Sequence, residues 1–189
     1  MDFKYNKSWI LFIGAEGAGK TYISKKLIQT ALNNKVPENS IWILDPNDLY
    51  KDFPKAHRII PKINEENVEF LDKTIKLIRS KSNILFIGDD IDIFLHSGYD
   101  SKEFDRIGKN IKQQTIGGIL HTHRPKFFNS RIYQICDYVF IGFGLNNIDK
   151  KYLNEVVNMD IDLYNKVQKH QFLIIERDTL QQHIIGDIA

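Results

Sequence analysis

The stretch "GAEGAGKT", Gly14 to Thr21, decides how this 189-residue chain folds. It has the pattern G-x-x-x-x-G-K-[ST], with the apolar run "WILFIG" (9–14) before it and a helical pattern at Thr21–Asn33 after it. A strand, a glycine-rich turn and a helix in this order form a phosphate-binding loop, or P-loop. From average residue frequencies, a chance match in a chain of this length has a probability of about one percent. The stretch therefore predicts a nucleotide site.

Each part of this P-loop has a role in binding a nucleotide. Lys20 places its ammonium group at the β- and γ-phosphates, and Thr21 offers its hydroxyl to Mg²⁺. The glycines let the backbone curl so that its N–H groups face phosphate oxygens. We therefore expect the nucleotide to contact one continuous segment, made of Gly14, Ala15, Glu16, Gly17, Ala18, Gly19, Lys20, Thr21 and Tyr22.

Short apolar runs and helical patterns alternate along the rest of the chain. The runs lie at 41–45, 84–90, 117–121, 138–144 and 172–177, and the candidate helices at 21–33, 65–79 (with Asn64 as N-cap), 100–113 and 149–157. Continuous apolar strands that alternate with helices predict an open, mostly parallel α/β sheet covered on both faces. The last run, "FLIIERDTLQQHIIGD", predicts a hairpin at the sheet edge. We expect a three-layer α/β fold of the P-loop NTPase type, in a single domain over residues 1–189.

An acidic pair ends the run "ILFIGDD", at the edge of the sheet where ligands bind. We assign Asp89 to Mg²⁺, through a bound water, and Asp90 to polarising the water that attacks the phosphate. Asp92, on the next turn, is a further candidate.

A second polar group of residues ends the run "GGILHTHRP" (117–125). His121 and His123 have the same parity along the strand, so both point to one face of the sheet. For His121 we predict a hydrogen bond between its ring and the backbone. The only cysteine, Cys136, excludes a disulfide framework and a Cys-based zinc site, and we expect it to be a small buried residue.

Three segments in this order resemble the FtsK/HerA-type DNA-pumping ATPases: "DPNDLY" (45–50), "ILFIGDDID" (84–92) and "FDRIGKNIKQQTIGGILHTHRP" (104–125). In that family a D-P-x-G-E-Y-like turn ends the second strand and T-Q-R-P ends the fourth. The resemblance covers roughly residues 8–145 and implies a RecA/FtsK-like fold with ATP and Mg²⁺ as cofactors. Two positions depart from it, because His123 stands where the family has a glutamine sensor and Asp90 where it has glutamate.

A motor domain without added domains is similar to the genome-packaging ATPases of tailless, membrane-containing double-stranded DNA viruses. That resemblance implies an ATP-driven double-stranded DNA translocase in a homo-oligomeric ring, expected to be a hexamer. It also implies contacts with capsid or membrane proteins of a virion, and a place in the host cytoplasm or the virion.

Such ring motors complete each site with an arginine from the neighbouring subunit. The resemblance places it near "RIGKN" (106–110), where Gly108-Lys109 stands at the family's glycine-arginine pair. We favour Arg106, on a basic helix face with Lys102, Lys109 and Gln113, then Arg124 and then Arg131. Lys73, Lys76 and Arg79 form a second basic stripe that could contact DNA phosphates.

Composition is that of a globular protein, with 42% hydrophobic and 26% charged residues and a net charge of +2. This charge neither demands nor excludes nucleic acid. The polar N-terminus and the absence of any apolar run near the roughly 20 residues of a membrane span predict a cytoplasmic protein that does not span a membrane.

Other functions fit parts of the same pattern. A small P-loop kinase fits in size, but no arginine-dense lid is present in the sequence. A nucleotide-switch or assembly ATPase, which would hydrolyse ATP slowly, also fits. Asp90 has a shorter side chain than the family's glutamate, and His123 replaces its glutamine sensor. A conjugation or chromosome motor that acts with separate membrane and DNA-reading subunits is not cleanly separated from a viral one, although the missing membrane anchor weighs against it. GTP is disfavoured because "NNID" (146–149) lacks the lysine of a guanine-reading motif.

Overall fold

The computed structural model describes residues 4–62, 64–65, 67–95, 101–103, 106, 115–127 and 130–186. These residues form one eight-stranded sheet with the strand order β3-β2-β4-β5-β1-β6-β7-β8. The strands are β1 (Trp9–Ile13), β2 (Ile41–Leu44), β3 (His57–Ile59), β4 (Ile84–Gly88), β5 (Ile116–Thr122), β6 (Tyr138–Gly142), β7 (Phe172–Glu176) and β8 (Gln182–Ile185). From β3 to β6 all neighbours are parallel, and β7 and β8 are antiparallel. The predicted parallel sheet and edge hairpin are confirmed.

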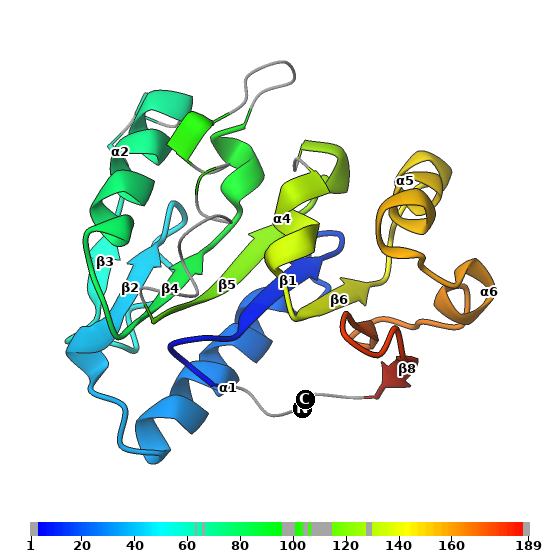
Figure 1. Cartoon of the computed structure of the whole chain (residues 1–189), viewed down its shortest axis with the longest axis horizontal. Helices are drawn as coiled ribbons and strands as arrows, with labels where there is room; N and C mark the ends of the chain where they lie inside the picture. Colours follow the sequence, from blue (N-terminus) through cyan, green and yellow to red (C-terminus); the bar gives the residue numbers. More distant parts are fainter. Residues whose placement is uncertain are drawn as a thin grey trace.

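Helices cover both faces of this sheet (Figure 1). α1 (Lys20–Asn33) lies on one face, and α2 (Val68–Arg79), α4 (Ser130–Ile135) and α5 (Asn147–Val157) pack on the other; a short α6 (Ile161–Tyr164) precedes the hairpin. The three expected layers are therefore present. Within the described ranges, no helix is both long enough and apolar enough to span a bilayer.

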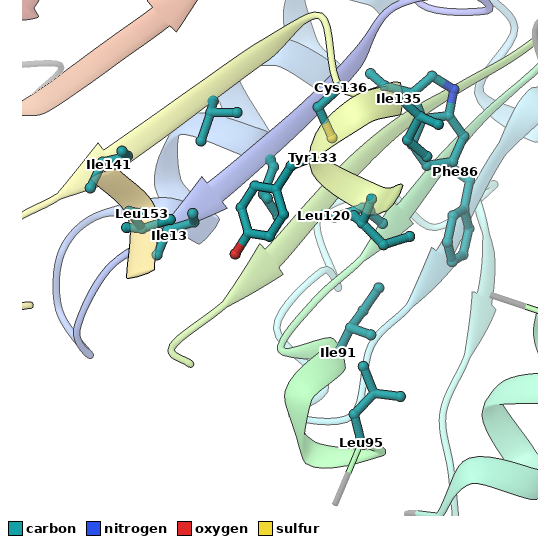
Figure 2. Packing of buried hydrophobic residues seen from close by; sticks show 14 of the residues in the cluster. Ile13, Phe86, Ile91, Leu95, Leu120, Tyr133, Ile135, Cys136, Ile141 and Leu153 are labelled. Carbon is teal, nitrogen blue, oxygen red and sulfur yellow. The ribbon is translucent and has the colours of Figure 1, made fainter. Parts of the chain in front are cut away.

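The residues of β1 alternate between two hydrophobic clusters. Trp9, Leu11 and Ile13 face the cluster under α2 and α4, part of which Figure 2 shows, whereas Ile10 and Phe12 face the cluster under α1. All five side chains of β1 are fully buried because the strand lies in the middle of a sheet covered on both sides. Cys136 lies in the first cluster, which confirms the prediction that it is buried.

Two glycines in β5 make room for the N-terminal part of the chain. A Cβ atom on Gly118 would lie 2.3 Å from the ring of Trp9, and one on Gly117 would lie 2.0 Å from the carbonyl oxygen of Tyr5. The Trp9 indole also donates a 2.8 Å hydrogen bond to the Ile116 carbonyl. The glycines of "GGILH" thus serve close packing against β1.

The predicted start of α2 differs from the structure, α5 begins at Asn147 rather than at residue 149, and the predicted helix at 100–113 lies mostly outside the described residues. α2 begins at Val68 rather than Glu65, and its N-cap is Asn67, whose side chain accepts a 3.0 Å bond from the Phe70 N–H. Asn64 was therefore a wrong prediction; it adopts φ +72 and lies outside the helix. Of the expected helix at 100–113, only 101–103 and 106 are described, so the Gly108-Lys109 pair and Gln113 lie outside the described residues.

Candidate nucleotide-binding site

The P-loop connects β1 to α1 at the carboxyl edge of the sheet. Gly17 and Gly19 adopt φ +73 and +98, conformations that favour glycine and that curl the loop. The Gly14 N–H donates to the Thr122 carbonyl at the end of β5, and the Ala15 N–H donates to the Phe143 carbonyl after β6. The loop is therefore held between the two strands that flank β1.

An open cleft of about 580 Å³ lies above this loop. Residues 16–22 line it, together with Asn47, Leu49, Asp90, Ile93 and His123. This volume lies in the usual range for small-molecule sites. Most of the predicted nucleotide segment thus faces one cavity, while Gly14 and Ala15 form the floor below Lys20.

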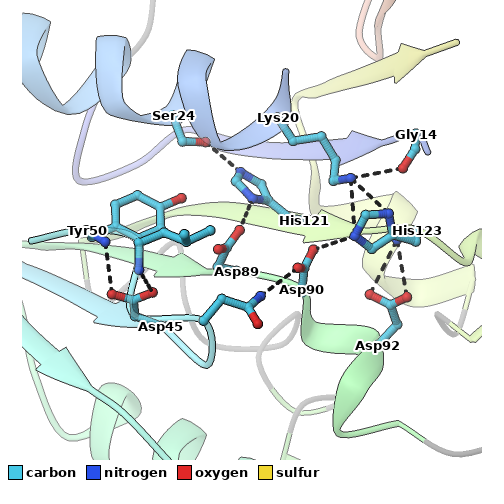
Figure 3. A network of polar contacts seen from close by, with 12 residues as sticks. Gly14, Lys20, Ser24, Asp45, Tyr50, Asp89, Asp90, Asp92, His121 and His123 are labelled. Carbon is cyan, nitrogen blue, oxygen red and sulfur yellow. Dashed lines mark hydrogen bonds and ion pairs between the residues drawn. The ribbon is translucent and has the colours of Figure 1, made fainter. Parts of the chain in front are cut away.

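The ammonium group of Lys20 is buried beside the loop. Its Nζ donates to the carbonyl oxygens of Gly14 (2.9 Å) and Ala15 (3.3 Å) and lies 3.1 Å from Nδ1 of His123 (Figure 3). Burial lowers the pKa of Lys20, and the carboxylates of Asp90 and Asp92 oppose that shift. The hydrogen-bond acceptors of Lys20 on the backbone thus belong to the P-loop itself.

Asp90 and His123 are in hydrogen-bond contact at the mouth of the cleft. Nε2 of His123 lies 2.8 Å from Oδ1 of Asp90, and Asn47 donates a 3.0 Å bond to Oδ2. Burial acts to raise the pKa of Asp90, but the hydrogen bond and charge of His123, with the charge of Lys20, hold it below its ordinary value. These contacts assign the ring proton to Nε2, which leaves Nδ1 to accept a hydrogen bond from Lys20.

Asp92 has a different role from Asp90. Its carboxylate accepts from the His123 backbone N–H at 3.3 and 3.2 Å, and so it holds the end of β5 in place. Burial raises the pKa of Asp92. Asp92 is not among the residues that line the cleft.

Asp89 is fully buried and does not itself line the cleft, whereas the next residue, Asp90, does. Its Oδ1 contacts Nδ1 of His121, whose Nε2 lies 2.6 Å from Oγ of Ser24 on α1. The predicted bond between the His121 ring and the backbone was wrong, because parallel strands bring the tips of β4 and β5 together under α1 and supply two side-chain partners. Among the described residues, Oδ2 of Asp89 is buried and has no hydrogen-bond partner.

The oxygen atoms at this site fit Mg²⁺. The unpartnered Oδ2 of Asp89 is an acceptor of the kind that Mg²⁺ prefers, and the hydroxyl-bearing Thr21 lines the cleft. Within the described part of the chain, no cluster of three His, Cys, Asp or Glu side chains could hold a metal alone. Mg²⁺ here would share its ligands with nucleotide phosphates, which is its usual mode of binding.

Two of the candidate arginines, Arg106 and Arg124, are described, and neither is among the residues that line the cleft. Arg106 is exposed and pairs with Glu103 at 2.6 Å, and Arg124 is exposed at the end of β5. Arg131 begins the first turn of α4, and its side chain lies outside the described residues.

The predicted basic stripe on α2 is partly neutralised. Lys73 pairs with Glu69 at 2.8 Å, and Arg79 pairs with Glu103. Lys76 is exposed. Pairing with carboxylates reduces the positive potential that this face can offer to phosphates.

The sequence did not predict several residues around the P-loop. Asn47, Leu49 and Ile93 line the cleft, and a Cβ atom on Gly19 would lie 3.8 Å from Nδ1 of His170, just before β7. The "DPNDLY" turn was a usable signal for Asn47 and Leu49. Asp45 organises that turn by accepting bonds from the backbone N–H groups of Leu49 (2.8 Å) and Tyr50 (3.0 Å).

No family model matches this sequence, and no curated protein matches it. Solved structures do match. The genome packaging NTPase B204 from Sulfolobus turreted icosahedral virus 2, in complex with ATP-gammaS, superposes with a TM-score of 0.80 and 16% identity, over 99% of this chain and 100% of that one. The DNA-packaging ATPase B204 from Sulfolobus turreted icosahedral virus gives 0.77 and 18%, over 97% and 100%.

The chain has the fold of the FtsK/HerA-type P-loop ATPases. The pCW3 conjugation coupling protein TcpA, with ATPgS, matches at a TM-score of 0.68 and 15% identity, over 97% of this chain and 61% of that one. The FtsK/HerA-type fold is thus shared with chains as short as this one and with longer ones. The order of its strands brings Lys20, Asp90 and His123 together at the P-loop edge of the sheet.

Proposed function

We propose that this chain, acting as one P-loop ATPase domain over residues 1–189, hydrolyses ATP to move double-stranded DNA, most specifically as a viral genome-packaging motor. The observation that carries the proposal is the convergence of Lys20, Asp90 and His123 at the mouth of a cleft lined by the P-loop. The neighbours with this fold include DNA-packaging ATPases that match the chain over nearly its full length. Their functions motivate the translocase part of the proposal.

The hydrolytic step uses groups with suitable charges. Asp90 is a carboxylate because its pKa is held low, so it accepts a hydrogen bond from the water that attacks the γ-phosphorus. The water oxygen bonds to phosphorus as the bond to the β–γ bridging oxygen breaks, a proton of the water passes to an oxygen of the released phosphate, and ADP and phosphate leave. His123, hydrogen-bonded to Asp90, orients that carboxylate and contacts the γ-phosphate as a sensor.

Binding of the triphosphate uses the P-loop. Lys20 contacts the β- and γ-phosphates, and P-loop backbone N–H groups contact their oxygens, apart from those of Gly14 and Ala15, which hold the loop to the neighbouring strands. Thr21, and Asp89 through a bound water, would hold Mg²⁺, which would neutralise phosphate charge. An arginine from a neighbouring subunit, Arg106 first and Arg124 second, stabilises the transition state.

ATP is the favoured nucleotide. The "NNID" segment is used to begin α5, where Asn146 accepts a 2.8 Å bond from the Asp149 N–H and donates a 2.7 Å bond to its carboxylate. Asp149 is therefore engaged in a helix cap and does not stand as a guanine reader. The remaining parts of the proposal are a homo-oligomeric ring, expected to be a hexamer, in the host cytoplasm or virion, with capsid or membrane proteins of a virion as partners.

The test is steady-state ATP hydrolysis with and without long linear duplex DNA, with Lys20→Ala as the blank. We expect duplex DNA to stimulate hydrolysis, and Lys20→Ala to remove both basal and stimulated rates. Single-stranded DNA of equal nucleotide content is the matched control for charge. Hydrolysis that duplex DNA does not change would contradict the translocase and favour a nucleotide-switch or assembly ATPase. Phosphoryl transfer to a small acceptor would favour a kinase.

A further inference from the structure

We propose that His121 is a positioning residue for Asp89: by bridging Ser24 to Oδ1, it holds the carboxylate so that Oδ2 alone is presented to the metal–nucleotide complex. This inference rests on the proposed function of the P-loop as a Mg²⁺–nucleotide site. It assigns a role to a histidine that the hydrolytic step does not use.

Three elements supply the chain of contacts. Ser24 lies on α1, His121 at the end of β5 and Asp89 directly after β4, and all three are buried, with 0% exposure. Figure 3 shows the His121 ring between the other two side chains. Since the carboxylate can only accept, Nδ1 of His121 donates to Asp89, and Nε2 is in hydrogen-bond contact with the Ser24 hydroxyl.

A serine, a histidine and an aspartate in this order also occur in hydrolases that use a serine nucleophile. The Ser24 hydroxyl faces His121 from α1 and does not line the cleft, so we assign it no nucleophilic role. The effect of these contacts therefore depends on where the two outer side chains, Ser24 and Asp89, lie. Ser24 lies one helical turn after Lys20 and three residues after Thr21, and Asp89 directly precedes Asp90, which lines the cleft.

The two oxygens of Asp89 are distinguished by this contact. Oδ1 is occupied by His121, whereas Oδ2 is buried without a hydrogen-bond partner among the described residues. Tyr50 stays a neutral phenol, because burial and the charge of Asp89 raise its pKa well above the ordinary value. A single free oxygen, held in a fixed orientation, is what a group that binds metal directly or through water requires.

Two substitutions at His121 separate the two contacts. The amide nitrogen of asparagine lies near the place of Nδ1, so His121→Asn keeps a donor for Asp89. The amide of glutamine lies nearer the place of Nε2, so His121→Gln keeps the contact with Ser24 and loses the donor. The measurement is Mn²⁺ affinity in the presence of a non-hydrolysable ATP analogue, by electron paramagnetic resonance of free Mn²⁺, beside the affinity for the analogue without metal.

We expect His121→Gln to lower the Mn²⁺ affinity by about 10- to 100-fold, the usual effect of removing a partner of a metal ligand. The affinity for the metal-free analogue should stay unchanged, and His121→Asn should recover most of the lost Mn²⁺ affinity. Ser24→Ala should lower the Mn²⁺ affinity in the same direction but less, because the ring loses the partner that orients it. This variant also tests the proposal if His121→Gln does not fold.

Two results would overturn the inference. One is an equal loss of metal-free and Mn²⁺-dependent affinity, which would indicate a general packing role for His121. The other is Mn²⁺ affinity that neither His121→Gln nor Ser24→Ala changes. The assay needs neither hydrolysis nor DNA. If the chain binds Mn²⁺ and nucleotide as expected but duplex DNA does not stimulate its hydrolysis, only the proposed translocase function is contradicted.

Discussion

Nζ of Lys20 lies 3.1 Å from Nδ1 of His123, although 103 positions separate the two residues in the chain. The P-loop lysine and the residue at the end of β5 therefore meet at one point at the mouth of the cleft. A phosphate oxygen placed between them would accept hydrogen bonds from Lys20 and, when the ring carries a proton on that side, from His123. Changes in the protonation of His123 thus act directly on the group that binds phosphate.

Hydrolysis should depend on pH through His123. The hydrogen bond with Asp90 raises the pKa of His123 from 6.5, although burial and the charge of Lys20 oppose the shift. As pH falls through this raised value, the ring becomes a cation and no longer accepts from Lys20. We expect kcat/KM to fall with decreasing pH between about pH 8 and 5.5. In His123→Gln, which cannot titrate, this limb of the profile should be flat; an unchanged limb would contradict the assignment.

The raised pKa of His123 should affect stability and hydrolysis in opposite directions as pH falls. A histidine whose pKa is raised in the folded protein stabilises the fold below its unfolded value, and this contribution is lost as pH rises through the folded value. Chemical denaturation of the native chain and of His123→Gln over the same pH range separates the two effects. The difference in unfolding free energy between them should be largest at the acid end.

Asp90→Asn should remove hydrolysis and keep the fold. Asp90 adopts φ 42 and ψ 49, a left-handed conformation that aspartate and asparagine both tolerate. Because the carboxylate is lost, the hydrolysis rate should fall by about 10²- to 10⁴-fold. ATP analogues should still raise the melting temperature as in the native chain. A rate within a few-fold of native would assign the water to another carboxylate.

An arginine supplied by a neighbouring subunit should reveal itself in mixed rings. Arg106→Ala alone should lower the hydrolysis rate by about 10³-fold or more, because its charge stabilises the transition state. Mixing inactive Arg106→Ala with inactive Asp90→Asn should restore part of the rate, since one interface then holds an intact Asp90 and an intact Arg106. The matched control is Arg124→Ala in the same mixture. Recovery only with Arg124→Ala would transfer the role to Arg124.

Gly118→Ala should destabilise the chain without touching the cleft. The added methyl group would lie 2.3 Å from the Trp9 ring in the centre of the sheet. Overpacking of this kind costs about 1–3 kcal/mol, which corresponds to roughly 2–4 °C of melting temperature for each kcal/mol in a chain of this size. Gly186→Ala is the control, because no atom lies within 4 Å of its added Cβ. Equal melting temperatures for the two variants would contradict this account.

The main features of the fold could be predicted because each has a local signal. The P-loop identifies the central strand, and the continuous apolar runs identify the other strands buried on both faces. β3 was missed because its three residues, "HRI" (57–59), include two polar side chains and lie at the sheet edge. The true start of α2 was missed because Asn64 and Asn67 are equally suitable N-cap residues, and only tertiary packing selects Asn67.

Part of the candidate site was also predictable from local sequence signals. Lys20, Asp90 and His123 lie in motifs that end strands, and parallel strands bring such ends together. The partner of His121 was not predictable, because Ser24 is 97 positions away and carries no motif. His170 beside Gly19 is a similar case, since the approach of the segment before β7 to the P-loop depends on the pairing of Phe172 with Gly142.

The central place of β1 has a consequence for synthesis on the ribosome. Its neighbours, β5 and β6, lie more than 100 residues later, and the Gly14 N–H finds its acceptor only at Thr122. At about 5–20 residues per second, the ribosome needs roughly 5–20 s to travel from the end of β1 to Thr122. During that interval an apolar segment waits without its strand partners, and nucleotide cannot yet stabilise the nascent chain. Chaperones that shield apolar segments would act on this protein in that interval.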